Sequence, residues 1–316
     1  MRKFLLLLLL SQMALAEPML GTYSIVARDP QTGRLGVAVE SHWFNVRANV
    51  PWARPGVGAA ATQAATNSAF GYRGLALMAQ GETPRAALTR LLTEDSGAAR
   101  RQVGYVDAQG RTASWTGELC IPAAVSIEGE QFVVQSNLMD KDTVSQAMAE
   151  AFRQSRGPLE FRLLAALKAA QKEGGDLRGM QSAAMVVVAA KDTGNPVADT
   201  IVDLSVEDHP HPLEELERLL GMHQEYASYN AMIKAVDDHD PAALEPLLAK
   251  LSPENQELRF WVALELYRNG ARHRALALFK PVFEANDAWR ELLPRLVPAE
   301  LLTIEQVKAI QKALPR

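Results

Sequence analysis

Apolar runs with short periods open the chain and predict β-strands. Residues 22–28 and 35–40 are β-rich runs that flank a turn containing Asp29, Pro30 and Gly33, which is typical of a β-hairpin with a loop of several residues. A third run, residues 57–63, is small and apolar, and such side chains let another backbone or a ligand approach closely. We therefore expect the domain to begin with a hairpin beside a wall that lines a cleft.

Strand and helix patterns then follow in blocks. Two further hairpins are predicted, and the segment 62–72 reads as a polar loop. The expected strands are 103–107, 111–116, 125–127, 131–135, 181–190 and 200–206, and the expected helices are 73–80, 84–94, 141–154 and 159–172. This order predicts an α+β domain of antiparallel sheets covered by helices and argues against a doubly wound parallel sheet.

From Pro212 onward the strand signals stop and the pattern is helical. Residues 260–284 predict two helices that turn at an Asn-Gly pair, with small and aromatic residues at the spacing of a tetratricopeptide-like unit, namely Ala263, Ala275 and Phe279. Residues 232–251 and 289–314 could supply neighbouring helices. The tail is either a groove for a peptide or protein partner, or a helical cap or dimerisation arm of a homo-oligomer.

The first sixteen residues have the pattern of an export signal. Arg2 and Lys3 precede an apolar run, residues 4–10, that is too short to span a bilayer, and residues 14–16 form an A-x-A cleavage site. We expect a periplasmic or secreted protein whose first mature residue is Glu17, without a membrane span. The predicted organisation is a signal peptide (1–16), an α+β domain (17–211) and an all-α domain (212–316).

Composition narrows the classes of function. The 316 residues include 33 Lys and Arg against 37 Asp and Glu, for a net charge of −4 and a pI near 5.9. This balance argues against a nucleic-acid-binding surface. Cys120 is the single cysteine of the sequence, so neither a disulfide framework nor a thiolate metal cluster is expected.

Thr22 is the first candidate for chemistry, because it follows Gly21 at the head of the first strand. If the chain were cut between these residues, the new α-amine, with a reference pKa of about 7.7 to 8.0, would lie beside the hydroxyl and could act as its base. The hydroxyl could also attack the preceding carbonyl, and glycine would not obstruct it. Signal cleavage alone leaves residues 17–21 in front of Thr22, so the hypothesis requires a second cut. On these residues alone, a threonine at a strand start is an ordinary structural residue.

Several ordered motifs resemble a bacterial family, the domain of unknown function 1028. The resemblance covers roughly residues 21–220 and is carried by TYSIVARDP from Thr22, GVAV from Gly36, VPWAR from Val50, GAAATQ from Gly58, VDAQG from Val106 and GGDLRGMQSA from Gly174. That family is similar to the N-terminal nucleophile (Ntn) hydrolases, whose fold is two antiparallel sheets between helical layers. The resemblance implies a four-layer αββα sandwich with Thr22 as nucleophile.

An Ntn-type site also needs donors for the developing oxyanion and a charge that tunes the amine. Within the resemblance, the candidate catalytic residues beside Thr22 are Asn137, Asp176, Arg178 and Gln181, and the candidate substrate-binding residues are Ser41 and Gln63. The alternative is structural: Asp176 and Arg178 would form a loop salt bridge, and Gln181 would cap a strand.

Asp208, His209 and His211 form the one histidine cluster and could be read as a metal loop, but two histidines separated by one proline are awkward joint ligands. We expect a junction into the helical tail there, with no metal and no cofactor.

The leading hypothesis is an exported amide-bond hydrolase with a small-molecule or peptide substrate. The rival is a non-catalytic envelope binding or scaffold protein that recruits partners through its helical tail.

Overall fold

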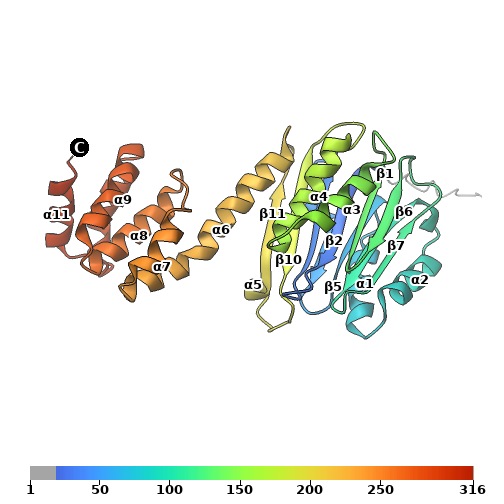
Figure 1. The fold of residues 1–316 in the computed structure, drawn as a ribbon, viewed down its shortest axis with the longest axis horizontal. Coiled ribbons are helices and arrows are strands. Elements are labelled where there is room, and N and C mark those ends of the chain that lie inside the picture. The colour runs from blue at the N-terminus through green and yellow to red at the C-terminus, as the bar shows by residue number, and fades with distance from the viewer. Residues whose placement is uncertain (1–18, 316) are drawn as a thin grey trace, which may run out of the picture. The chain divides into compact units, whose positions relative to one another are not determined.

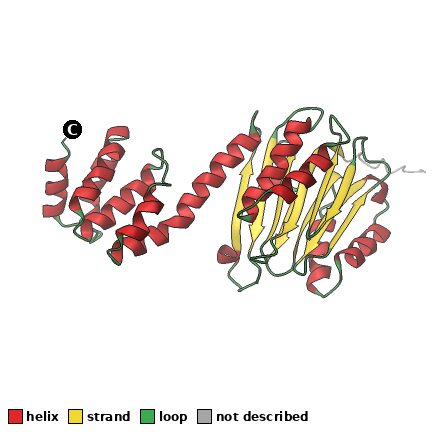
Figure 2. Cartoon of the chain, in the orientation of Figure 1, coloured by secondary structure: helices red, strands yellow, loops and turns green. Residues whose placement is uncertain are grey.

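The structure, a computed structural model, describes the backbone of residues 19–315. The predicted signal peptide and Glu17 lie outside the described residues. The chain divides into two compact units, Met1–Glu217 and Arg218–Arg316. The first combines antiparallel sheets with helices and the second is helical, as the colours of Figures 1 and 2 show. This coarse mixed class agrees with the sequence prediction.

One sheet of the first unit has six strands, all antiparallel to their neighbours. In spatial order they are β11 (Thr200–Val206), β10 (Ser182–Val188), β3 (Leu35–Ser41), β2 (Thr22–Arg28), β9 (Phe132–Asn137) and β8 (Val125–Gly129). The predicted first hairpin, β2 and β3, is therefore central. Its turn reaches Gly33, whose φ of 71° lies in the left-handed region that glycine adopts readily.

The other sheet has five strands and is also antiparallel. Its strands are β1 (Met19–Leu20), β5 (Gly58–Ala65), β6 (Arg101–Asp107) and β7 (Thr112–Thr116), with β4 (Pro51–Arg54) also pairing with β5. The small residues of β5 are buried along its whole length. Two residues of the segment before Thr22 thus complete this sheet, as Met19 pairs with Ala65 and Leu20 with Ala64.

Alternate side chains of β2 point to opposite layers, as a strand requires. Val26 packs in a cluster with Val37, Ala59 and Val106, so one face of β2 looks toward the five-stranded sheet. On the opposite face, the Tyr23 hydroxyl donates to Gln171 of the helix that covers the six-stranded sheet. Thr22 and Ser24 share the face of Val26, which places their hydroxyls between the sheets.

Each sheet contacts one pair of helices. The helices α1 (Ala69–Ala79) and α2 (Pro84–Glu94) pack on the five-stranded sheet, where Phe70 and Leu88 bury against Tyr105. The helices α3 (Val144–Gln154) and α4 (Leu159–Glu173) pack on the six-stranded sheet and lie across it in Figure 2. The remaining short helices of this unit are η1 (Val46–Ala48), η2 (Ala98–Arg100) and α5 (Pro196–Asp199).

Some boundaries differ from those expected. The strand β5 continues to Ala65, and α1 begins at Ala69, inside the segment expected to be a polar loop. The reason is Asn67, whose side-chain oxygen accepts the backbone N–H of Ala69 and so starts the helix four residues before Arg73. Likewise, α3 begins at Val144, three residues after the expected start.

The second unit is built from helices around one apolar cluster. Its elements are α6 (Pro212–Asp237), which begins in the first unit, α7 (Pro241–Leu248), α8 (Gln256–Arg268), α9 (Arg272–Ala285), α10 (Ala288–Leu292), η3 (Leu293–Leu296) and α11 (Ile304–Ala313). The turn between α8 and α9 contains Gly270 with a φ of 86°. Ala263, Ala275 and Phe279 are fully buried there, and the Phe260 and Phe279 rings meet edge to face at 5.4 Å.

Candidate functional site

Thr22 begins β2 between two polar residues of the neighbouring strands. In the strand register it lies directly opposite Ser41 of β3 on one side and Asn137 of β9 on the other. All three side chains are fully buried. The sheet therefore brings together three of the predicted site residues that are far apart in sequence.

The hydroxyls of Thr22 and Ser41 form a chain that ends on the carbonyl before Thr22. The Ser41 Oγ donates to the Gly21 carbonyl oxygen at 2.6 Å, and the Thr22 Oγ1 lies 3.0 Å from the same Ser41 Oγ. Because the single proton of Ser41 points to Gly21, the Thr22 hydroxyl must be the donor between the two hydroxyls. The order of donation is thus Thr22 to Ser41 to the Gly21 carbonyl.

The Gly21 carbonyl has a second, charged donor. Arg178 Nη2 reaches it at 3.1 Å, while the same guanidinium makes a two-point contact with the Asp176 carboxylate, at 3.0 and 2.8 Å. The carboxylate is fully buried and also accepts the backbone N–H of Arg178. The predicted loop salt bridge exists, and it additionally places a cation on the Gly21 carbonyl.

The glycine-rich loop that carries this pair is tied to the end of β9. Asp176 forms an isolated bridge with Met139, and the backbone N–H of Asp140 donates to Gly175. Gly174 and Gly175 have φ values of 142° and 67°, conformations that favour glycine. The sequence folds this way because the helix α4 ends at the glycines and the chain can reverse onto β9.

Gly21 fits closely against the Asp176–Arg178 pair. A Cβ at this position would lie 2.5 Å from Asp176 Oδ2, 2.6 Å from Arg178 Nη2 and 2.9 Å from Leu138 Cδ2. Distances this short are not seen for real Cβ atoms. The space at position 21 therefore fits glycine, which has no side chain.

A buried amide network continues from the site between the sheets. Gln63 Nε2 donates to the Thr22 carbonyl at 3.0 Å and to Gln102 Oε1 at 2.8 Å, and its Oε1 accepts from Ser24. Asn137 Nδ2 donates to the same Gln102 oxygen at 3.1 Å. Gln102 thus orients two predicted site residues, although the sequence reasoning missed it. It lies in β6 one residue before the start of the predicted strand 103–107.

Glu40 is a second residue that the sequence reasoning missed. It is fully buried beside Tyr23, its partner across the strands, and neither carboxylate oxygen has a hydrogen-bond partner among residues 19–315, although Tyr23 and the Gln181 backbone lie near. Burial, followed by the nearby Asp176 charge, raises the pKa of Glu40 well above its ordinary value. Burial and then Glu40 likewise raise the pKa of the Tyr23 phenol. Burial thus disfavours the charged form of the Glu40 carboxyl.

Gln181 and the histidine cluster belong to the junction before α6. The Gln181 side-chain amide donates to Asp208 at 3.0 Å, and the His209 backbone N–H donates to the Gln181 carbonyl. His209 Nδ1 accepts the backbone N–H of His211. Within residues 19–315, no three His, Cys, Asp or Glu side chains lie close enough together to hold a metal ion.

The intact chain keeps Thr22 away from solvent. Its exposed fraction is 0%, and the preceding residues occupy the carbonyl side of the site and pair with β5. A separate substrate cannot reach the hydroxyl in this state. Chemistry on another molecule therefore requires the segment up to Gly21 to leave.

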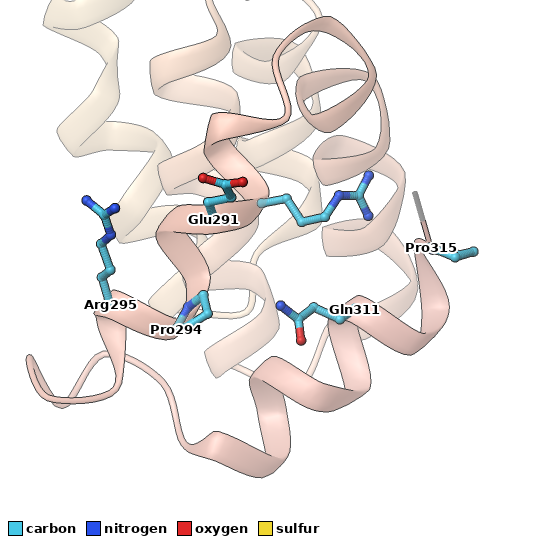
Figure 3. A pocket seen from close by; sticks show the side chains of 6 residues that line it. Glu291, Pro294, Arg295, Gln311 and Pro315 are labelled. Atoms are coloured by element: carbon cyan, nitrogen blue, oxygen red, sulfur yellow. The ribbon is translucent and has the colours of Figure 1, made fainter.

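A pocket of about 450 Å³ lies in the second unit instead, as Figure 3 shows. None of the predicted site residues lines it; its walls are Arg290, Glu291, Pro294, Arg295, Gln311 and Pro315. Over the described part of the chain, no helix combines the length and the apolar character needed to cross a bilayer.

Comparison with known proteins identifies a family and a similar solved structure. Residues 22–216 match the family described as "Family of unknown function (DUF1028)". The crystal structure of protein SPO2555 from Silicibacter pomeroyi, a protein of the same family, is 33% identical, with a TM-score of 0.57, over 64% of this chain and 88% of that one. No curated protein matches this chain.

Proposed function

This chain belongs to the family of unknown function DUF1028, and we propose that it is an exported amide-bond hydrolase of the Ntn type whose nucleophile is Thr22. In this proposal, its first unit is an Ntn-hydrolase-like αββα sandwich. The support for the fold is the pairing of each antiparallel sheet with its own two helices. The support for the nucleophile is that the family match begins at residue 22.

The observation that carries the proposal is the setting of the Gly21 carbonyl. Ser41 and Arg178 both donate to its oxygen, and the Thr22 hydroxyl donates to Ser41. Donors aimed at a carbonyl oxygen stabilise the negative charge that develops there when a nucleophile attacks. The arrangement is what cleavage before Thr22 requires.

The first step is a transfer of the Gly21 acyl group from nitrogen to oxygen. The Thr22 Oγ1 bonds to the Gly21 carbonyl carbon, its proton passes to the Ser41 Oγ, and the Ser41 proton passes to the carbonyl oxygen. The C–N bond then breaks, the nitrogen takes that proton, and an ester remains. Water hydrolyses the ester, which leaves a Gly21 carboxylate and the free hydroxyl and amine of Thr22. Arg178 holds the carbonyl oxygen in both stages.

The freed α-amine then acts as the base for reaction with a substrate amide. An amine of ordinary basicity near neutral pH can take the Thr22 proton as the hydroxyl attacks, and it returns that proton to the leaving nitrogen. Water then hydrolyses the acyl ester on Thr22, which releases the acyl product as a carboxylic acid and restores the hydroxyl. Ser41 and Arg178 hold the substrate carbonyl oxygen where they held that of Gly21. Gln63 fixes the Thr22 carbonyl, and Asn137 lies opposite Thr22 with its amide held by Gln102.

The mature N-terminus tests the proposal. Mass spectrometry of the purified protein should give Thr22 as the first residue, and the Thr22→Ala variant should retain the residues before position 22. Amide hydrolysis should accompany the Thr22 terminus alone. A wild-type protein that begins at Glu17 and hydrolyses amides would exclude this mechanism.

One observation favours the rival function. Thr22 is fully buried in the intact chain, so a protein that is never cut would be a scaffold, and its tetratricopeptide-like tail would then bind a partner. Under this alternative the wild type begins at Glu17, turns over no amide, and loses partner binding when the helical core is disrupted.

A further inference from the structure

The segment removed by cleavage indicates which ligand the site can bind afterwards. Gly21 is the acyl residue of the first reaction, since its carbonyl carbon is the one that Thr22 attacks. A later substrate must present its own carbonyl carbon to the same hydroxyl. Its acyl residue therefore takes the place of Gly21, a step that rests on the proposed function.

The side chains around the Gly21 position determine which acyl residue fits there. The carboxylate of Asp176 is fully buried and bonded to Arg178, so moving it aside would break these hydrogen bonds. A methyl group on the α-carbon would lie 2.5 Å from it and 2.9 Å from Leu138. Overpacking of this kind is unfavourable. An acyl residue without a side chain fits.

The pairing of β1 indicates how the residues that precede the acyl residue bind. Met19 and Leu20 pair antiparallel with Ala65 and Ala64 of β5, next to the stretch of β5 that β4 covers. Removal of β1 leaves this end of the β5 edge unpaired. A strand edge of this kind binds an extended peptide through main-chain hydrogen bonds.

We propose that the processed protein cleaves peptide amides after glycine, with the glycyl residue against Asp176 and Leu138 and the preceding residues extended along the Ala64–Ala65 edge of β5. The acyl donor is thus a peptide, and its leaving group departs from the side of the Thr22 amine. The protein's own segment before Thr22 is the first example of such a ligand.

Binding of product peptides tests the selectivity without turnover. The protein is the chain beginning at Thr22, and the probes are the fluorescent peptides Glu-Pro-Met-Leu-Gly and Glu-Pro-Met-Leu-Ala with free carboxylates, followed by anisotropy. The glycine peptide should bind at least tenfold more tightly. Equal binding of the two peptides, or binding of neither, overturns the inference. The uncut full-length Thr22→Ala variant, whose site holds its own Gly21, should bind neither.

Two variants at one position separate shape from charge. Asp176→Asn keeps the wall and should keep the preference for glycine, whereas Asp176→Ala opens it and should bring the two peptides within about threefold of each other. If Asp176→Asn abolishes the preference while Asp176→Ala retains it, the steric explanation is wrong. Thermal melting confirms that each variant folds. If a variant does not fold, the binding of the two peptides to the wild-type protein decides the question.

Turnover of the corresponding anilides distinguishes this inference from the proposed function. Glycine-selective binding without hydrolysis of Glu-Pro-Met-Leu-Gly-anilide would support the glycine subsite and contradict the proposed hydrolase activity. Hydrolysis of glycyl and alanyl anilides at equal rates would support the hydrolase activity and contradict the glycine subsite.

Discussion

Ser41 and Thr22 lie directly opposite each other on neighbouring strands, with their hydroxyl oxygens 3.0 Å apart. The cross-strand pairing fixes this distance, because opposite residues of an antiparallel pair project to the same face. Ser41 is thereby held between the Thr22 hydroxyl and the Gly21 carbonyl.

Replacement of Ser41 by alanine removes both the proton path and one donor to the Gly21 carbonyl. We expect the Ser41→Ala variant to cut before Thr22 about 10²–10³ times more slowly than the wild type, the usual effect of one oxyanion donor. The measurement is a time course of the N-terminus by mass spectrometry. Ser145→Ala, which removes a buried hydroxyl bonded to Ser136 and Val125, is the matched control and should cut at the wild-type rate. Unchanged cleavage in Ser41→Ala would refute its role.

A methyl group at Gly21 should destabilise the intact chain. In a Thr22→Ala background, which keeps the segment attached, Gly21→Ala should lower the free energy of unfolding of the first unit by about 1–3 kcal/mol, because the new Cβ meets Asp176 and Leu138. Denaturant titration measures the change. Gly221→Ala, in the second unit, is the contrasting control. Apart from its own helix, no atom lies within 4 Å of an added Cβ there, and alanine favours a helix over glycine by up to about 1 kcal/mol, so the stability of the first unit should not fall. If Gly21→Ala leaves the free energy of unfolding unchanged, the side chains around position 21 are not closely packed.

Glu40 should make stability depend on pH. Its folded pKa is raised by burial, so its favourable contribution is complete below the ordinary value and is lost as the pH rises toward the folded value. Glutamine does not titrate. The stability of Glu40→Gln relative to wild type should therefore grow by about 1.4 kcal/mol per pH unit above about pH 4.3, until the folded pKa is passed.

Thermal melts from pH 4 to 8 follow this difference. Glu118→Gln, the same substitution at an exposed position, is the control for the loss of one carboxylate. A constant difference between Glu40→Gln and wild type across this range would show that Glu40 ionises normally.

The aromatic core of the second unit should support that unit alone. Phe279 is fully buried against Phe260, so Phe279→Ala should lower the free energy of unfolding of this unit by about 3–5 kcal/mol. Calorimetry should show one transition shifted and the transition of the first unit unchanged, with cleavage before Thr22 unaffected. Ile304→Ala, at an exposed position, should shift neither. A shift of both transitions would mean that the units unfold together.

The strands and helices could largely be predicted from the sequence, because their signals are local. The alternation of residues 22–28 and 35–40, and the turn residues between them, suffice for a hairpin. The start of α1 could not be placed, because it depends on local contacts of Asn67 and Ser68, among them the Asn67 side chain that accepts the Ala69 N–H. The boundary of a helix is decided by such contacts more than by periodicity.

For the candidate site, the sequence pointed to Thr22, Ser41, Asn137, Asp176 and Arg178 separately, and the motif resemblance was needed to group them. Periodicity could not show that Ser41 and Asn137 flank Thr22, since that follows from the pairing of β3, β2 and β9. Gln102 and Glu40 escaped notice because a polar residue in a strand has no distinct signal until its burial is known.

By itself the sequence determined the order of strands and helices, the acidic balance, the change to helices after Pro212 and the glycine before Thr22. These are properties of local pattern and composition. Tertiary structure alone decided that the Gly21 carbonyl lies between Ser41 and Arg178 and that an added methyl would strike Asp176. Ser41 lies 20 positions from Gly21 in the chain and Arg178 lies 157 positions away, and strand register and loop packing set the distances of these contacts.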